Sequence, residues 1–147
     1  EYKGKKYYTL FGFDDNEFVS TKKWLEVLTF NENKEPVFGG HFFDYKEDSI
    51  KPAQPAYRFC LEFKKDAKAR MVYDPELDMI IIDHLISESN EPNKKFTLIP
   101  DGDYEGFKWV NGKWVHVDKV FSEQQLKNGE FPMPVPFFDE KGNPLKP

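Results

Sequence analysis

The sequence has almost no cysteine and no long apolar run, and both absences restrict what the protein can be. Cys60 is the single cysteine among 147 residues, so the chain cannot form a disulfide within itself. A chain of this length buries roughly two-thirds of the surface that its unfolded state exposes, so it needs no disulfide or metal to fold. No segment is long and apolar enough for a transmembrane helix, and we expect no membrane insertion. No signal peptide is present, but the chain opens at Glu1 without a methionine, so a signal could precede it.

Positive charge is also scarce. The chain has 21 Lys and Arg against 26 Asp and Glu, and the net charge of −5 is spread along its length. No basic stripe is available to displace counterions from phosphates, so we expect no nucleic-acid partner, and an anionic membrane surface is disfavoured for the same reason. Leucine and alanine are few, whereas 15 Phe, 7 Tyr and 3 Trp raise the aromatic fraction to 17%. Such a composition favours sheet over helix.

The centre of the sequence predicts a β-hairpin over residues 68–87. Two apolar runs, at residues 71–73 and 79–82, flank a turn-forming cluster that contains Asp74 and Pro75. Pro75 presets φ for the second position of a tight turn, and the Asp74 carboxylate can accept bonds from the amides ahead of it. The four consecutive apolar residues of the second arm do not alternate with polar ones. They therefore predict a strand that is buried on both faces, inside the sheet.

Aromatic and alternating segments predict further strands on both sides of this hairpin. They are residues 7–13, 23–30, 36–43, 57–64 and 95–99. For residues 22–28 two interpretations stay open: one arm of a second hairpin, or a helix capped by Ser20 or Thr21. We favour the strand, because β-branched and aromatic residues continue the run. Gly39 and Gly40 predict a bulge or a close backbone approach in the return arm.

Asn111 and Gly112 form the strongest hairpin signal in the chain, because a type I′ turn needs positive φ at both positions. This turn sets the register of residues 107–118. One face of the hairpin then carries four ring side chains, Phe107, Trp109, Trp114 and His116. Such a face can bind a glycan or a protein partner, because flat aromatic rings stack on sugars and are enriched at interfaces. We favour the alternative that the four residues belong to the core, since exposing two Trp would leave a large apolar patch.

The most enzyme-like motif is the pair Asp83 and His84. Adjacent residues of a strand point to opposite faces, so these two cannot easily form a hydrogen-bonded dyad. No nucleophile motif such as GxSxG accompanies them. We therefore assign no catalytic residue, and we keep a hydrolase that uses Asp83 or His84 with acidic partners from distant strands as the alternative function.

The first half of a calcium-binding loop has the same pattern as residues 101–106, with carboxylates at Asp101, Asp103 and Glu105 and a glycine at Gly106. Position 12 of that loop is Gly112, where a bidentate glutamate is required, and no helices flank the motif. A tight acidic turn between strands explains the same residues. The histidines have no zinc-like spacing, and we expect no cofactor.

Together these patterns predict a mainly β fold at residues 1–121. We expect an antiparallel meander of about eight or nine strands, forming a curved sheet or a barrel with little helix. Residues 122–147 form a Pro-rich strap or tail in which proline alternates with apolar residues at positions 131–138. These residues are too apolar to stay in water, so we expect them to dock on a neighbour or on their own domain, covering a sheet edge.

Four stretches resemble, in their order and spacing, an uncharacterised family of exported proteins of Bacteroidetes. They are residues 6–13 (KYYTLFGF), 22–39 with its FNENKEPVFG loop, 71–85 (MVYDPELDMIIIDHL) and 104–118 (YEGFKWVNGKWVHVD). The resemblance covers about residues 6–120 and departs from the family at the Pro-rich residues 51–55. It implies a periplasmic or cell-envelope protein and brings no activity, cofactor or catalytic residue to any position.

We therefore expect a non-catalytic binding or interaction module of the cell envelope, with a protein or a glycan as its partner. The absence of a catalytic constellation and the resemblance favour this function over the hydrolase. The sequence leaves the oligomeric state open.

Overall fold

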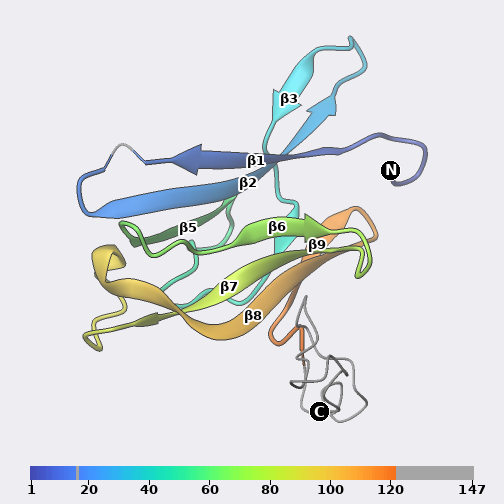
Figure 1. Ribbon diagram of the computed structural model, residues 1–147. Coiled ribbons are helices and arrows are strands. Elements are labelled where there is room, and N and C mark those ends of the chain that lie inside the picture. The colour runs from blue at the N-terminus through green and yellow to red at the C-terminus, as the bar shows by residue number, and fades with distance from the viewer. Residues whose placement is uncertain (16, 122–147) are drawn as a thin grey trace, which may run out of the picture.

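The computed structural model describes residues 1–15 and 17–121, which form two β-sheets packed over one core (Figure 1). Nine strands are present in this part of the chain: β1 (Tyr8–Asp14), β2 (Ser20–Phe30), β3 (Pro36–Phe38), β4 (Phe43–Asp44), β5 (Phe59–Lys64), β6 (Met71–Asp74), β7 (Met79–Ser87), β8 (Leu98–Val110) and β9 (Lys113–Val117). A single 3₁₀ turn, η1 (Lys95–Thr97), is the helical element among these residues. The predicted mainly β fold with little helix is confirmed.

The first sheet is organised around β2. Strand β1 pairs along one side of β2, while β5 and β3 pair in succession along its other side. The second sheet has the order β4-β9-β8-β7-β6, so β4 and β6 are its edges. Strand β4 runs parallel to β9 over two residues, and the other pairings among the described strands are antiparallel. The two curved sheets do not close into a barrel (Figure 1).

Residues 22–28, for which helix and strand were both open, belong to β2. The alternation along β2 places Leu25 and Val27 in the core and Trp24 and Leu28 on the outer face. β-Branched residues and the two flanking strands stabilise this extended backbone.

Two predicted strands differ in their extent. The return arm at residues 36–43 is interrupted after Phe38, because Gly39 has a φ of +85°, which ends the extended backbone. Residues 95–97, predicted to begin a strand, form η1 instead, because the Thr97 hydroxyl donates to the Lys94 carbonyl oxygen at 2.7 Å. Strand β8 starts only at Leu98 and then continues without a break to the Asn-Gly turn.

The core lies between the two sheets and is rich in aromatic rings. Phe59 of β5 and Phe107 of β8 are fully buried, with ring centroids 4.8 Å apart. Ile80 and Ile82 of β7 face this core, whereas Ile81 faces a second small cluster on the outer side of the sheet. Strand β7 is thus buried on both faces over residues 79–83, as its unbroken apolar run predicted.

The hairpin of β8 and β9 has the predicted register, with Trp109 opposite Trp114 and Phe107 opposite His116. Asn111 and Gly112 have φ values of +49° and +79°, as a type I′ turn requires.

Within residues 1–15 and 17–121, no helix has the length and apolarity to cross a membrane. The predicted Pro-rich strap or tail, residues 122–147, lies outside the described residues.

Replacing Trp114 tests the packing of this hairpin against the first sheet. Trp114 is buried, its Nε1 donates to the Thr9 hydroxyl at 3.0 Å, and its ring centroid lies 5.3 Å from that of Trp109. We expect Trp114→Ala to lower the free energy of unfolding by about 3–5 kcal/mol. Trp109→Ala should cost less, because Trp109 is only half-buried. Thermal melts of both variants check this order, and a wild-type midpoint for Trp114→Ala would contradict it.

Candidate functional site

The inner face of the first sheet extends beyond the second sheet along strand β1. Thr9, Phe11 and Phe13 pair with inner-facing residues of β2 and so point toward the core side. At the start of β1 this face is covered, since Thr9 accepts the bond from Trp114. Farther along, Phe11 is 47% exposed and Phe13 is 63% exposed. Two aromatic residues on the core side of the sheet therefore remain in contact with water.

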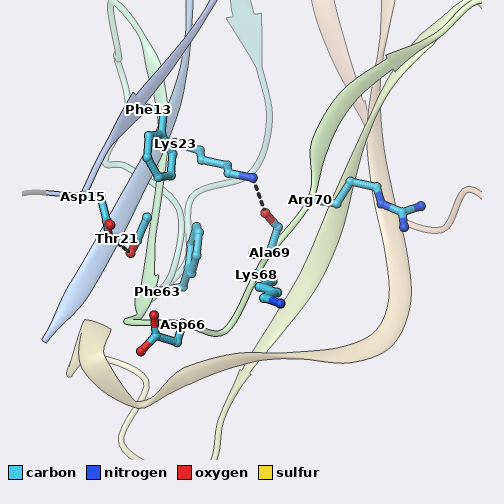
Figure 2. A pocket seen from close by; sticks show the side chains of 9 residues that line it. All are labelled: Phe13, Asp15, Thr21, Lys23, Phe63, Asp66, Lys68, Ala69 and Arg70. Atoms are coloured by element: carbon cyan, nitrogen blue, oxygen red, sulfur yellow. Dashed lines mark hydrogen bonds between the residues drawn. The ribbon is translucent and has the colours of Figure 1, made fainter.

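A cavity of about 380 Å³ lies beside these rings (Figure 2). It is lined by Phe13, Asp15, Thr21, Lys23, Phe63, Asp66, Lys68, Ala69 and Arg70. A second hollow of about 150 Å³ shares Phe13 and Lys23 with the first and reaches Phe11 and Met71. The two hollows form one depression between edge strands β1 and β6, which we call the β1–β6 groove.

Lys23 connects the two sheets across this groove. Its ammonium donates to the carbonyl oxygen of Ala69, just before β6, at 2.8 Å (Figure 2). At the end of the cavity Thr21 donates to Asp15 at 2.8 Å, and Lys65 is 2.6 Å from the same carboxylate. The bond from Lys65, followed by the bond from Thr21, lowers the pKa of Asp15. The guanidinium of Arg70 points away from the other lining side chains (Figure 2).

Strand β6 presents main-chain groups to the groove that no other described strand pairs with. The Asp83 amide donates to the Arg70 carbonyl oxygen at 3.1 Å, and the Arg70 amide donates to the Asp83 carboxylate. Arg70 therefore directs its main-chain groups toward β7. Because this direction alternates along a strand, the amides and carbonyls of Met71 and Tyr73 point away from β7. Since β6 is the last strand of its sheet, these groups face the open side, next to the Ala69 carbonyl that Lys23 occupies.

Sequence reasoning missed this groove. Phe11 and Phe13 stand at alternating positions of a predicted strand, which is the pattern of an ordinary core face. No local signal tells that β1 ends a sheet or that the opposite sheet stops short of it.

The four predicted ring residues of the Asn-Gly hairpin lie together, as their register requires. Phe107 and Trp114 belong to the core, and Trp109 packs against it. The side chain of His116 is only 8% exposed. The structure thus supports the core interpretation for this face, and ligand binding by these residues stays a prediction.

His116 instead belongs to a buried charged network that the sequence did not indicate. Glu105 of β8 accepts from His116 at 2.7 Å and from Lys51 at 3.1 Å, and Lys51 also donates to Asp48 at 2.8 Å. Burial would raise the pKa of Glu105, but the bond to His116 and the charge of Lys51 lower it. Burial also acts to raise the pKa of Asp48, but bonds from Lys51 and from the backbone lower it to about 2. The network fixes the loop before β5 to the second sheet.

Two of the three predicted metal ligands are bound to other side chains. Asp101 bonds His84 at 2.8 Å and the amide of Asp103 at 3.0 Å, whereas Glu105 is occupied by the buried network. Burial would raise the pKa of Asp101, but the Asp103 amide and His84 lower it. In the part of the chain that the structure describes, no group of three or more His, Cys, Asp or Glu side chains could hold a metal ion.

Asp83 and His84 bind different partners and form no hydrogen-bonded dyad with each other. The buried Asp83 carboxylate accepts from the Arg70 amide, and it thereby holds the start of β6. His84 lies at a register shift of β7 and pairs with Asp101 in solvent. Among residues 1–15 and 17–121, no Ser, Thr or Cys is hydrogen-bonded to Asp83 or His84 through its side chain.

Glu105→Gln tests the buried network through its pH dependence. Because folding lowers the pKa of Glu105 below its ordinary 4.5, its carboxylate stabilises the fold above that pH. This contribution is lost as the pH falls through the lowered pKa. We expect Glu105→Gln to cost about 1.5–3 kcal/mol at pH 7, as for hydrogen bonds to charged groups.

The cost should shrink between pH 4.5 and the acid limit, and urea titrations at a series of pH values measure it. Asp103→Asn is the matched control, because Asp103 is an exposed carboxylate of the same strand. A cost of Glu105→Gln that is independent of pH would contradict the assignment.

Comparisons with protein-family models, with curated proteins and with solved structures gave no match. The resemblance to exported proteins of Bacteroidetes therefore stays a prediction. The function has to be inferred from the chain's own residues.

Proposed function

We propose that the protein is a non-catalytic binding module whose partner occupies the β1–β6 groove. The observation that carries this proposal is the exposure of Phe11 and Phe13 on the core side of β1. Burying a Phe side chain contributes about 1.5–3 kcal/mol, so a partner that covers both rings gains several times the thermal energy. Packing among the described residues leaves this contribution incomplete, since Phe11 is 47% and Phe13 63% exposed.

The chemistry of the groove favours a polypeptide over a glycan. Met71 and Tyr73 offer main-chain donors and acceptors that repeat every second residue, and a second main chain matches this spacing. Apolar side chains of such a partner would meet Phe11 and Phe13 at the same time. A protein partner that adds a strand to β6 therefore satisfies both the polar and the apolar groups of the groove.

A location in the periplasm or cell envelope is part of this proposal and rests on the resemblance alone. The hydrolase alternative receives no further support. Asp83 is used by the Arg70 amide, and His84 with Asp101 forms an exposed pair to which no described residue adds a nucleophile.

A displayed library of random linear peptides tests the groove as the binding site. We expect peptides selected on the wild-type protein to lose about tenfold or more in affinity for Phe13→Ser, since removing a buried Phe contact costs at least about 1.4 kcal/mol. Phe38→Ser is the matched control. Phe38 is 62% exposed, like Phe13, but it pairs with Leu28 on the outer face of the first sheet.

Calorimetric titration of the selected peptides into the three proteins measures the affinities. Both variants should melt at or above the wild-type midpoint, because each removes an exposed aromatic ring. Failure of the library to yield binders, or equal affinity for wild type and Phe13→Ser, would refute the groove as the site.

A further inference from the structure

We infer that residues 131–137 of this chain are themselves a strand partner for β6 in the β1–β6 groove. This inference rests on the proposed function, because it names a polypeptide that the same groove binds. The chain's own segment then fills the β1–β6 groove, and an external partner has to displace it.

The free edge of β6 sets a strict requirement on its partner. Met71 and Tyr73, whose main-chain groups face the groove, also direct their side chains to the inner face, opposite Ile82 and Ile80. Residues directly opposite each other in a ladder share one face. The partner residues that bond to β6 must therefore be apolar and inward-facing. The intervening residues face outward and need no amide hydrogen.

The sequence of residues 131–137 fulfils this requirement at every position. Phe, Met, Val and Phe stand at the odd positions, and Pro132, Pro134 and Pro136 stand between them. Proline has no amide hydrogen and is confined to strands whose N–H side faces solvent at that position. Alternation with period two therefore gives one bonding, apolar edge and one edge without donors. This arrangement is compatible with an edge strand that pairs on a single side.

The described chain ends beside the start of β6. The ring of Phe121 lies 5.8 Å from that of Tyr104, and the guanidinium of Arg70 lies 5.6 Å from the same Tyr104 ring. Ten residues lead from Phe121 to Phe131, and they can span up to about 33 Å. Strand β6 is four residues long and measures about 13 Å, so either of its ends is within reach.

Charge favours an antiparallel direction. Asp139 and Glu140 follow the segment after one further residue, Phe138. In an antiparallel pairing they come to lie at the start of β6, where Lys68 and Arg70 are exposed. Opposite charges at this end favour this direction over the parallel one.

Hydrogen exchange of the full chain tests this pairing at single amides. In the wild type, the amides of Met71 and Tyr73 should exchange about tenfold or more slowly than in Val135→Asp, since opening a paired edge costs local free energy. Pro134→Asp is the matched control. It places the same charge on the outward edge and should leave both exchange rates at their wild-type values.

Three results would overturn the inference. Equal exchange of both amides in wild type and Val135→Asp would mean that the segment does not pair with β6. Loss of protection in Pro134→Asp as well would mean that the alternation does not matter. Protection that disappears on dilution, together with a dimer in sedimentation, would mean that a second copy supplies the strand.

The selected library peptides separate this inference from the proposed function. If both are right, Val135→Asp binds these peptides more tightly than the wild type does, because the internal competitor is lost. If the peptides bind wild type and Val135→Asp equally while Phe13→Ser still weakens them, the groove is a binding site but residues 131–137 do not occupy it.

Discussion

The bond from the Lys23 ammonium to the Ala69 carbonyl oxygen joins the first sheet to the free edge of the second. The Ala69 carbonyl oxygen, just before β6, thereby has a hydrogen-bond donor. The Lys23 side chain spans the distance between β2 and this end of β6. Direct pairing of β1 with β6 would have joined the two sheets into one, and the Lys23 side chain spans the gap that such pairing would have to close. The β1–β6 groove lies in this gap, and Phe11, Phe13 and Met71 line it.

The two ends of strand β1 differ in how much of their inner face is buried. At its beginning Tyr7 packs on Trp109 and Thr9 accepts from Trp114, so the sheets close tightly around the hairpin of β8 and β9. At its end Phe11 and Phe13 project from the same face with little to cover them. Each ring forgoes part of the about 1.5–3 kcal/mol that full burial of a Phe side chain contributes. A fold selected for stability alone would have covered both ends.

Local chemistry explains which parts of the structure could be predicted from the sequence. The Asn-Gly turn has one favoured geometry, so it fixes the pairing of Trp109 with Trp114 without any knowledge of the rest of the chain. The unbroken apolar run of β7 likewise predicts its double burial. The groove depends on which strands end a sheet, and the contact of Lys51 with Glu105 joins residues 54 positions apart. Neither the groove nor this contact can be predicted from a short stretch of sequence.

Buried polar side chains have hydrogen-bond partners, whereas some apolar rings on the inner face of β1 stay exposed. This difference indicates what kind of partner the protein binds. Among the described residues, no buried side-chain nitrogen or oxygen lacks a hydrogen-bond partner. The charged groups of Lys51, Glu105 and His116 are paired with one another, with Asp48 and with Asp118. Within residues 1–15 and 17–121, the inner-face rings of β1 are partly exposed and the free edge of β6 has no strand partner. Rings and main-chain edges recognise another polypeptide chain, whereas catalysis needs polar side chains that are free to react.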